Sequence, residues 1–289
     1  MSRQRHESSW RWDGTQLLDP EHPAPSNGNG GFAASPYQRL LTHLRYLELN
    51  TAAEHLKAEL DEGHRKKLST TLILERLLAH EVSATQSRRL QTRIRTSQLP
   101  VGKSLENFDF DFQPSIDRQL VSELSTLRFI EEGRNVILVG PPGVGKTHLA
   151  VALGVRALQA GYRVFFTTAA DMVAHLQAVH LDGETKLSRT RRNFYVGPPL
   201  LIVDELGYLP LDRGSATWMF HVVSKRYQKG SIVLTSNRGF ADWGQIFDES
   251  VAATAIVDRL LHNAVVLNIR GRSYRMKGFP APSEAGSAP

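Results

Sequence analysis

GPPGVGKT, residues Gly140 to Thr147, is the stretch that decides the fold of this chain. The six residues before it, RNVILV at 134–139, are mostly apolar and typical of a strand, and the stretch after it, HLAVALGVRALQAG, has apolar residues at helical spacing. A strand, a Gly-rich turn and a helix N-terminus aim backbone N–H groups and the positive end of a helix dipole at one point. The sequence therefore predicts a nucleotide-phosphate site whose candidate contacts are Gly140, Pro141, Pro142, Gly143, Val144, Gly145, Lys146, Thr147 and His148.

Each residue type in this motif has a chemical reason to be there. Glycines at 140, 143 and 145 allow the tight turn and the close approach of phosphate oxygens. Lys146 would reach the β- and γ-phosphates, and the Thr147 hydroxyl would hold Mg²⁺. The motif thus predicts a nucleotide bound together with Mg²⁺.

From residue 134 onward, apolar strands alternate with helical patterns. Strands that are apolar throughout indicate a parallel sheet covered by helices on both faces, so we expect an α/β fold with five parallel strands. Before it, a helix is expected from about 115 to 131, ending with Gly133 in the C′ position. The predicted strands are 136–140, 163–168, 200–205, 231–237 and 264–269, and the predicted helices lie near 146–160, 170–180, 213–229 and 249–262.

The N-terminal part divides into a tail and a small helical region. Residues 1–35 are rich in Pro, Gly, Ser and Asn and predict a disordered tail, as does 278–289. Order should begin at Ser35–Pro36, an N-cap followed by Pro at the first helical position. Residues 36–103 then form a helical domain of four predicted helices, and 104–277 form the α/β domain. Residues 37–103 hold 12 Lys and Arg against 7 Asp and Glu; this charge indicates either a solvated face or contact with DNA phosphates or a partner protein.

Two acids follow the apolar run LLIV at 200–203. A strand buried on both faces would deliver Asp204 and Glu205 to the sheet edge beside the phosphate loop, where ligands of such sheets bind. Asp204 would support Mg²⁺ through water, and Glu205 would orient or deprotonate the attacking water. The alternative for an aspartate at a strand end is a helix cap.

Two further polar residues are candidates for the chemistry. Asn237 ends the run SIVLTSN and could reach the γ-phosphate and hold the attacking water, although Thr235, Ser236 and Asn237 are also ordinary turn residues. Arg259 lies on a predicted helix just before the last strand. An arginine supplied by a neighbouring subunit can stabilise the transition-state charge of hydrolysis; the alternative for Arg259 is a surface ion pair or a solvated side chain.

Basic residues gather in three places that suit contact with nucleic-acid phosphates. A cluster after the last strand surrounds Tyr274, and such a mixture of cations with an aromatic suits backbone-tracking contacts. The residues are Arg88, Arg89 and Arg93 in the helical region, Lys186, Arg189, Arg191 and Arg192 before the third strand, and Arg270, Arg272, Arg275 and Lys277 after the last strand.

Composition narrows the classes of protein further. The chain has 289 residues, 41% of them hydrophobic and 22% charged, as in ordinary globular proteins. It has no cysteine, which excludes disulfides and thiolate metal sites, and its 11 histidines lack metal-ligand spacing. The start of the chain lacks the apolar segment of a signal peptide, and we find no run of 18 apolar residues that would span a membrane. The 35 Lys and Arg exceed the 29 acidic residues, mild support for a polyanionic partner.

Four runs of this sequence resemble the IstB-like AAA+ ATPases, helper proteins of bacterial insertion sequences that are related to replicative-helicase loaders. The runs are NVILVGPPGVGKTHLAVALG, LLIVDELGYLP, GSIVLTSNRGFADWGQIF and VDRLLHNAVVLNIRGRSYRMK, and the match covers residues 37–277. The resemblance implies an AAA+ core with a helical N-terminal domain. Gly140–Thr147 becomes Walker A, Asp204–Glu205 Walker B, Asn237 sensor 1 and Arg259 the arginine finger. The chain departs from the wider AAA+ pattern after the last strand, where too few residues remain for the helical lid that would carry a sensor 2 arginine. Arg272 or Arg275 could compensate for its absence.

The resemblance also implies a function. Members of the family use ATP and form ATP-dependent homo-oligomers on double-stranded DNA, and they deliver target DNA to a transposase of the DDE type. We therefore expect a bacterial, cytoplasmic ATPase that binds duplex DNA largely without regard to sequence. Two alternatives stay open at this point, a replicative-helicase loader and a nucleotide-gated adaptor that binds ATP without hydrolysing it.

Overall fold

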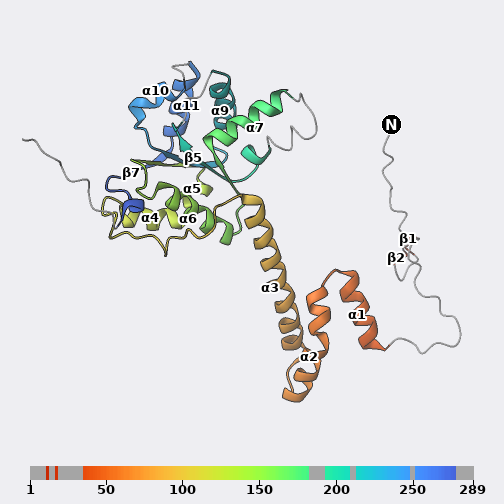
Figure 1. Ribbon diagram of the computed structural model, residues 1–289. Helices are drawn as coiled ribbons and strands as arrows, with labels where there is room; N and C mark the ends of the chain where they lie inside the picture. Colours follow the sequence, from red (N-terminus) through yellow and green to blue (C-terminus); the bar gives the residue numbers. More distant parts are fainter. Residues whose placement is uncertain are drawn as a thin grey trace, which may run out of the picture. The chain divides into compact units, whose positions relative to one another are not determined.

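The computed structural model describes residues 11–12, 17–18, 35–181, 193–208, 213–247 and 251–277. Its chain divides into two compact units, Met1–Ala84 and Thr85–Pro289, and Figure 1 shows the elements of each. The remaining residues of the predicted tails, 1–35 and 278–289, lie outside the described part, apart from Ser35 and a two-stranded antiparallel pair, β1 (Arg11–Trp12) with β2 (Leu17–Leu18). The domain bounds given above from the sequence stay predictions.

The first unit consists of α1 (Pro36–Tyr46), α2 (Asn50–Lys66) and the start of α3 (Thr70–Ser97). The predicted helix start is confirmed: the Ser35 side chain accepts a hydrogen bond from Gln38 N, the Gln38 side chain caps back onto Ser35, and Pro36 opens the helix. A small core holds the helices of this unit together. Its buried side chains are Leu44, Ala52, Ala53, Leu56 and Leu77.

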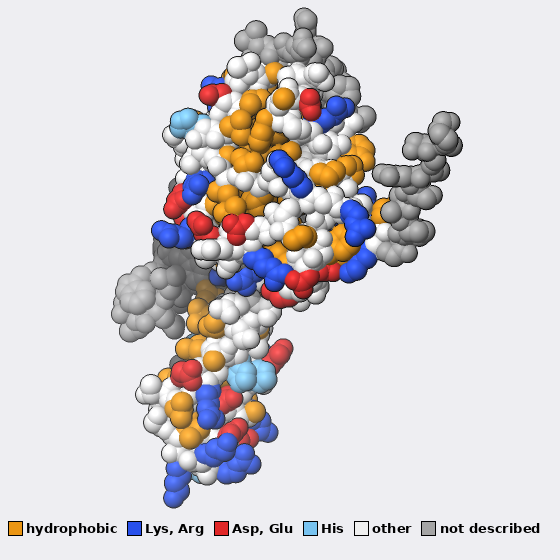
Figure 2. All heavy atoms as spheres, turned by 90° about the vertical axis from the view of Figure 1, so that its left-hand side faces the viewer, with side chains coloured by type: hydrophobic (Ala, Val, Ile, Leu, Met, Phe, Trp, Pro, Cys, Tyr) orange, Lys and Arg blue, Asp and Glu red, His pale blue; other side chains and the backbone are white. Residues whose placement is uncertain are grey.

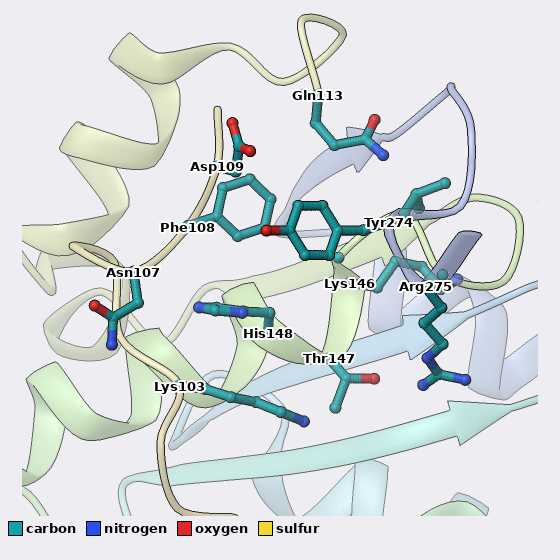
Figure 3. A pocket seen from close by; sticks show the side chains of 13 residues that line it. Lys103, Asn107, Phe108, Asp109, Gln113, Lys146, Thr147, His148, Tyr274 and Arg275 are labelled. Carbon is teal, nitrogen blue, oxygen red and sulfur yellow. The ribbon is translucent and has the colours of Figure 1, made fainter. Parts of the chain in front are cut away.

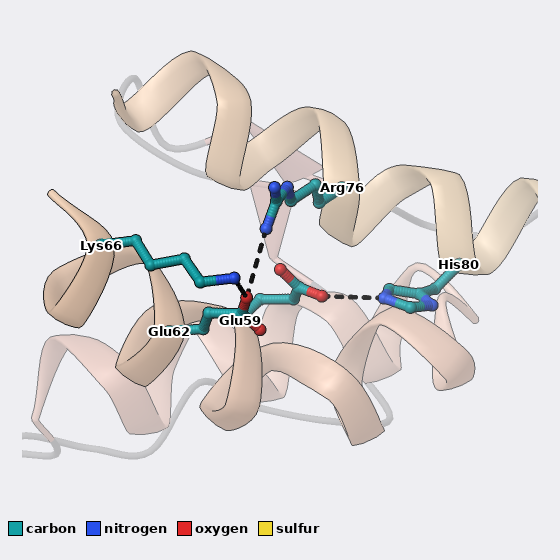
Figure 4. A network of polar contacts seen from close by, with 5 residues as sticks. All are labelled: Glu59, Glu62, Lys66, Arg76 and His80. Atoms are coloured by element: carbon teal, nitrogen blue, oxygen red, sulfur yellow. Dashed lines mark hydrogen bonds and ion pairs between the residues drawn. The ribbon is translucent and has the colours of Figure 1, made fainter. Parts of the chain in front are cut away.

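Polar contacts on the surface of this unit link α2 with α3 (Figure 4). Glu59 Oε1 lies 2.9 Å from His80 Nε2, and Glu62 pairs with Lys66 and lies 3.6 Å from Arg76 Nη1. The two contacts of Glu62 are exposed ion pairs, which stabilise a fold by at most about 1 kcal/mol each. The core, rather than these pairs, therefore holds the unit together.

The third and fourth helices predicted from the sequence are a single helix. α3 runs without a break for 28 residues, because the stretch between the two predicted helices, AHEVSATQS, contains neither Pro nor Gly. The sequence pattern changes its polar face there, but nothing in the backbone chemistry ends the helix.

The second unit is built on a sheet of five parallel strands, as predicted. The strands are β3 (Asn135–Val139), β4 (Val164–Thr168), β5 (Leu200–Leu206), β6 (Ser231–Ser236) and β7 (Ala264–Asn268), in the spatial order β4-β5-β6-β3-β7. All four neighbouring pairs in this sheet are parallel. The carboxyl ends of β5, β6 and β3 therefore meet at one edge.

Helices cover both faces of this sheet (Figure 1). Successive residues of β3 serve the two faces in turn: Val136 and Leu138 pack in one hydrophobic cluster, Ile137 and Val139 in the other. The first cluster includes residues of α4 (Arg118–Ser125), α5 (Arg128–Glu131) and α6 (Lys146–Gln159). The second includes residues of α7 (Ala169–Leu181), α9 (Arg213–Arg226), α10 (Trp243–Ile246) and α11 (Val251–Leu261). None of the helices in the described part of the chain is long and apolar enough to cross a membrane.

The helix expected from 115 to 131 is interrupted. Leu127 has a φ of 67°, which ends α4 and separates it from α5. Burial of the Leu127 side chain, which is only 5% exposed, explains why the chain adopts this unfavourable φ instead of continuing the helix. The predicted C′ glycine is confirmed, because Gly133 follows the C-cap Glu132 with a φ of 63°.

One arginine holds two strand starts in place. The Arg226 side chain, at the end of α9, is 2% exposed and donates hydrogen bonds to five carbonyl oxygens. Burial lowers the pKa of Arg226 to about 10. The acceptors are the carbonyls of Tyr195, Val196, Pro198 and Pro199, which lead into β5, and of Ser231, which opens β6.

Replacing Arg226 with methionine is expected to lower the free energy of unfolding by about 3 kcal/mol, because buried carbonyls lose their donors together. Urea unfolding followed by circular dichroism measures this. Lys225→Met is the matched control: it removes the same charge from the neighbouring, exposed position, and we expect at most about 0.5 kcal/mol from it. Equal unfolding midpoints for the two variants would contradict the role given to Arg226.

Candidate nucleotide site

The phosphate loop lies between the end of β3 at Val139 and the start of α6 at Lys146. Gly140 and Gly143 have φ values of 155° and 81°, and a Cβ would come within 2.1 Å of Ile269 O at the first and 2.0 Å of Ser273 Oγ at the second. No side chain would fit at either position without displacing its neighbour. The N-cap of α6, Gly145, offers no side-chain cap, so the first N–H groups of α6 are left for an anion.

Lys146 is held at the loop itself. Its side chain is 9% exposed, and Nζ donates to Gly140 O at 2.7 Å and to Pro141 O at 2.8 Å. Burial lowers the pKa of Lys146, the nearby Asp204 and Glu205 act to raise it, and Arg275 acts to lower it. Lys146 and Arg275 both line the cavity beside the loop, and two cations at one place suit the binding of a polyphosphate.

Exchanging Lys146 for alanine is expected to weaken nucleotide binding by about 10- to 100-fold, since a charge-assisted hydrogen bond contributes ~1.5–3 kcal/mol. Titration of a fluorescent ATP analogue measures the change. Lys229→Ala, at an exposed position after α9, is the control for the loss of one positive charge. Unchanged affinity in the Lys146 variant would contradict the assignment of the loop.

Two oxygen-bearing side chains meet where a cation is expected. Thr147 Oγ1 donates to Asp204 Oδ1 at 2.9 Å, and Asp204, at the carboxyl end of β5, is 4% exposed. A hydroxyl and a carboxylate suit Mg²⁺, which usually keeps several waters and takes only one or two protein ligands beside the phosphates. Among the described residues, no group of three or more His, Cys, Asp or Glu could hold a metal on its own.

Glu205 and Asn237 follow at the same edge of the sheet. Glu205 is exposed and has a φ of 63°, and its charge acts on Lys146 across the loop. Asn237 directly follows β6, and its Oδ1 is buried without a hydrogen-bond partner in the structure. Thr235 and Ser236, for which the sequence left open a turn, belong to strand β6. A buried amide oxygen with no partner is costly to keep, and it is the kind of group that a bound water or ligand satisfies.

Arg259 lies at the other end of the strands, beside their amino termini. It lines a small cavity with Asn135 and Ile232, which stand at the amino ends of β3 and β6. Its guanidinium lies 4.8 Å from the centre of the Phe220 ring, and Nη1 donates to Ala255 O at 3.1 Å. The five residues of β3 separate this edge from the phosphate loop by about 15 Å. Within one chain, Arg259 therefore does not meet the other candidate residues.

A cavity of about 230 Å³ opens beside the loop and is walled by two segments (Figure 3). Among the residues of these walls, the sequence suggested a nucleotide role only for Arg275, as a candidate sensor 2 residue. One wall is the stretch before α4, with Phe108 in edge contact with the His148 ring at 5.2 Å between centroids. The other is the C-terminal segment. Its residues Tyr274 and Arg275 line the cavity together with Lys103, Asn107, Asp109 and Gln113.

Hydrogen bonds fasten these two walls to the loop and to each other. Tyr274 N donates to Gly143 O at 2.9 Å, and Lys277 Nζ reaches Asp109 Oδ2 at 2.7 Å. Gln113 Nε2 donates to Arg272 O at 2.8 Å. Within the C-terminal basic cluster, the Lys277 side chain thus has a local partner, and Arg275 lines the cavity. The signal that could have revealed the first wall is the aromatic run FDFDF at 108–112, for which a surface position is unusual.

The candidate DNA-contacting residues of the helical region differ in how exposed they are. Arg93 is half-buried and donates to Leu158 O at 3.0 Å near the end of α6, whereas Arg88 and Arg89 are exposed on α3. The second cluster, Lys186, Arg189, Arg191 and Arg192, lies outside the described residues.

Comparisons with known proteins agree with a nucleotide-binding core. The model of the family described as "IstB-like ATP binding protein" matches residues 42–279. The chain is 45% identical over 234 residues to a Pseudomonas aeruginosa protein named as an ATP-binding protein of insertion sequence IS21, a match that covers 81% of this chain and 87% of the relative. A counterpart from insertion sequence IS5376 of Geobacillus stearothermophilus is 42% identical over 240 residues, 83% of this chain and 94% of that one. Among solved structures, AMPPCP-bound DnaA from Aquifex aeolicus has a TM-score of 0.48 and 26% identity over 62% of this chain and 54% of its own length.

Proposed function

Because the chain belongs to the family of IstB-like ATP binding proteins, we propose that it is an ATP-hydrolysing helper of DNA transposition. It binds duplex DNA largely without regard to sequence, assembles into an ATP-dependent homo-oligomer, and assists a DDE-type transposase in choosing and using a target. The observation that carries this proposal is the placing of Asp204 and Glu205 beside a complete phosphate loop, in a chain whose relatives belong to insertion sequences.

The candidate site supports hydrolysis rather than binding alone. Loop N–H groups and Lys146 hold the phosphates, while Thr147 and Asp204 would hold Mg²⁺, which neutralises charge on the phosphate oxygens when bound. The exposed carboxylate of Glu205 takes the proton of the attacking water, and Asn237 orients that water. A protein that only switched on ATP binding would have no use for Glu205 as a base.

The position of Arg259 supports self-association. The side chain stands at the far edge of the sheet from its own loop, so that it can stabilise transferring phosphate only in a second copy. Strand β7 is an edge strand of the sheet, and Val266 on it is 40% exposed. Figure 2, seen from the β7 side, shows hydrophobic side chains between charged ones on this face, a surface that suits burial in an oligomer.

Contact with DNA is assigned to exposed basic residues. Arg88 and Arg89 lie exposed on α3, and the chain as a whole has a pI near 9.6. Such residues contact phosphates rather than base edges, so binding is largely independent of sequence and weakens steeply with salt.

ATP hydrolysis by the purified protein, measured without DNA, with duplex DNA and with single-stranded DNA, tests the proposal. We expect stimulation by duplex of at least about fivefold, because DNA binding promotes the assembly that supplies Arg259 to the neighbouring site. Stimulation by single strands alone would overturn the assignment in favour of a helicase loader. Tight ATP binding with no turnover under any condition would favour a nucleotide-gated adaptor.

A further inference from the structure

Strands β5 and β6 shift their register at the two acids. Val203 of β5 lies opposite Leu234 of β6, but the next paired residue of β5, Leu206, lies opposite Ser236. Asp204 and Glu205 therefore share a single partner position, that of Thr235. Two residues facing one define a β-bulge, and bulges re-aim side chains next to active sites.

The Thr235 hydroxyl bonds to both residues of the bulge. It donates to Asp204 Oδ1 and accepts a hydrogen bond from Glu205 N at 3.0 Å. The side chain is 1% exposed, so no solvent would replace these bonds if the hydroxyl were lost. Asp204 Oδ1 also accepts from Thr147 Oγ1, which links Thr235 through one carboxylate to the start of α6.

The bulge explains how consecutive residues can share one task. In a regular strand, neighbouring side chains point to opposite faces of the sheet. Here Glu205 takes a φ of 63°, a conformation that residues other than glycine rarely adopt, and it is exposed while Asp204 is buried. Something must stabilise that backbone, and the hydrogen bond from Glu205 N to Thr235 Oγ1 is placed to do so.

We propose that Thr235 is a positioning residue for ATP hydrolysis, whose hydroxyl holds Asp204 toward Thr147 and Glu205 toward the attacking water. This inference rests on the proposed function and deepens it. Ser236, the residue after Thr235, contacts neither acid through its side chain. Ser236 Oγ donates to Leu206 O and Arg238 O and accepts a hydrogen bond from Arg238 N.

The test compares Thr235→Val, which keeps the shape and removes the hydroxyl, with Thr235→Ser, which keeps the hydroxyl. Ser231→Ala is the matched control, since Ser231 Oγ is a buried hydroxyl at the other end of the same strand, bonded to Phe129 O at 2.9 Å. ATP binding, the rate of hydrolysis in a single turnover, and hydrogen exchange at the Glu205 amide in the nucleotide-free protein are measured for all three.

In Thr235→Val, we expect hydrolysis to fall by about 30-fold or more, with ATP affinity within about threefold of the original protein, as for a loss confined to the transition state. The Glu205 amide should exchange at least about tenfold faster, because its acceptor is gone. Thr235→Ser should recover hydrolysis to within about fivefold, and Ser231→Ala should leave rate and exchange at Glu205 unchanged even where it unfolds at a lower temperature.

Two results would overturn the inference: hydrolysis by Thr235→Val within about twofold of the original, or equal losses in Thr235→Val and Thr235→Ser. If Thr235→Val does not fold, the comparison moves to Thr235→Ala in a Glu205→Gln background. There, losses that add independently would also contradict an action through Glu205. Should the original protein hydrolyse no ATP, the proposed function fails, but the exchange rate of the Glu205 amide still decides whether Thr235 holds the bulge.

Discussion

Replacing Arg259 with alanine is expected to leave ATP binding unchanged and to lower turnover by about 1,000-fold. An arginine that stabilises the transferring phosphoryl group contributes ~10³–10⁵ in rate, and Arg259 lies at the sheet edge remote from its own loop. Its present contacts, with the Phe220 ring and the carbonyl of Ala255, are weak enough to be exchanged for a phosphate. Steady-state hydrolysis with duplex DNA and titration with an ATP analogue measure the two quantities.

Arg128→Ala is the control for this experiment, because Arg128 is an exposed arginine on α5 whose loss removes the same charge. We expect it to hydrolyse ATP at the original rate. Turnover by the Arg259 variant within about tenfold of the original would show that no finger acts from this helix, since even the smallest effect of such a residue is larger.

Replacing Glu205 with glutamine is expected to lower hydrolysis by about 100- to 1,000-fold, the range for loss of a positioned general base. Glutamine keeps the shape of the side chain but cannot take a proton from water. ATP should therefore be trapped, and the oligomer on DNA should persist longer than that of the original protein. A single-turnover assay with labelled ATP and the lifetime of the DNA complex measure both effects.

Glu123→Gln, at an exposed position on α4, is the matched control and should behave as the original. Mixing the two site variants adds a sharper result. A Glu205→Gln subunit still carries Arg259, and an Arg259→Ala subunit still carries Glu205, so that some shared interfaces contain both groups. Recovery of activity in the mixture is expected; its absence would argue against an arginine supplied by a neighbour.

Local chemistry in the sequence was enough to predict the framework. The cap at Ser35 and the turn at Gly133 each depend on a few adjacent residues. The five parallel strands are short runs of mostly apolar residues, and such runs are typical of strands buried on both faces of a sheet. Such features can be read without knowing which parts of the chain meet. The glycines of the phosphate loop belong to the same class.

Features that depend on contacts between distant segments could not be predicted. Leu127 breaks a helical pattern because its side chain enters the core, and Arg226 finds its five carbonyls only once the lead into β5 lies beside α9. The wall of the cavity that contains Arg275 also required the fold. The sequence pattern showed a row of cations there. Only the fold shows that Arg275 lines the cavity at the loop while Lys277 bonds to Asp109.

The two walls of the nucleotide cavity come from positions far apart in the chain, with Asp109 and Lys277 separated by 168 positions in the sequence. Closing a chain segment of that length costs conformational entropy, which the contacts of the folded protein must offset. Without these two walls, the phosphate loop would not by itself enclose a nucleotide. A nucleotide that binds only the folded protein stabilises it against unfolding, by about 2.7 kcal/mol when the free nucleotide is at a hundredfold excess over Kd.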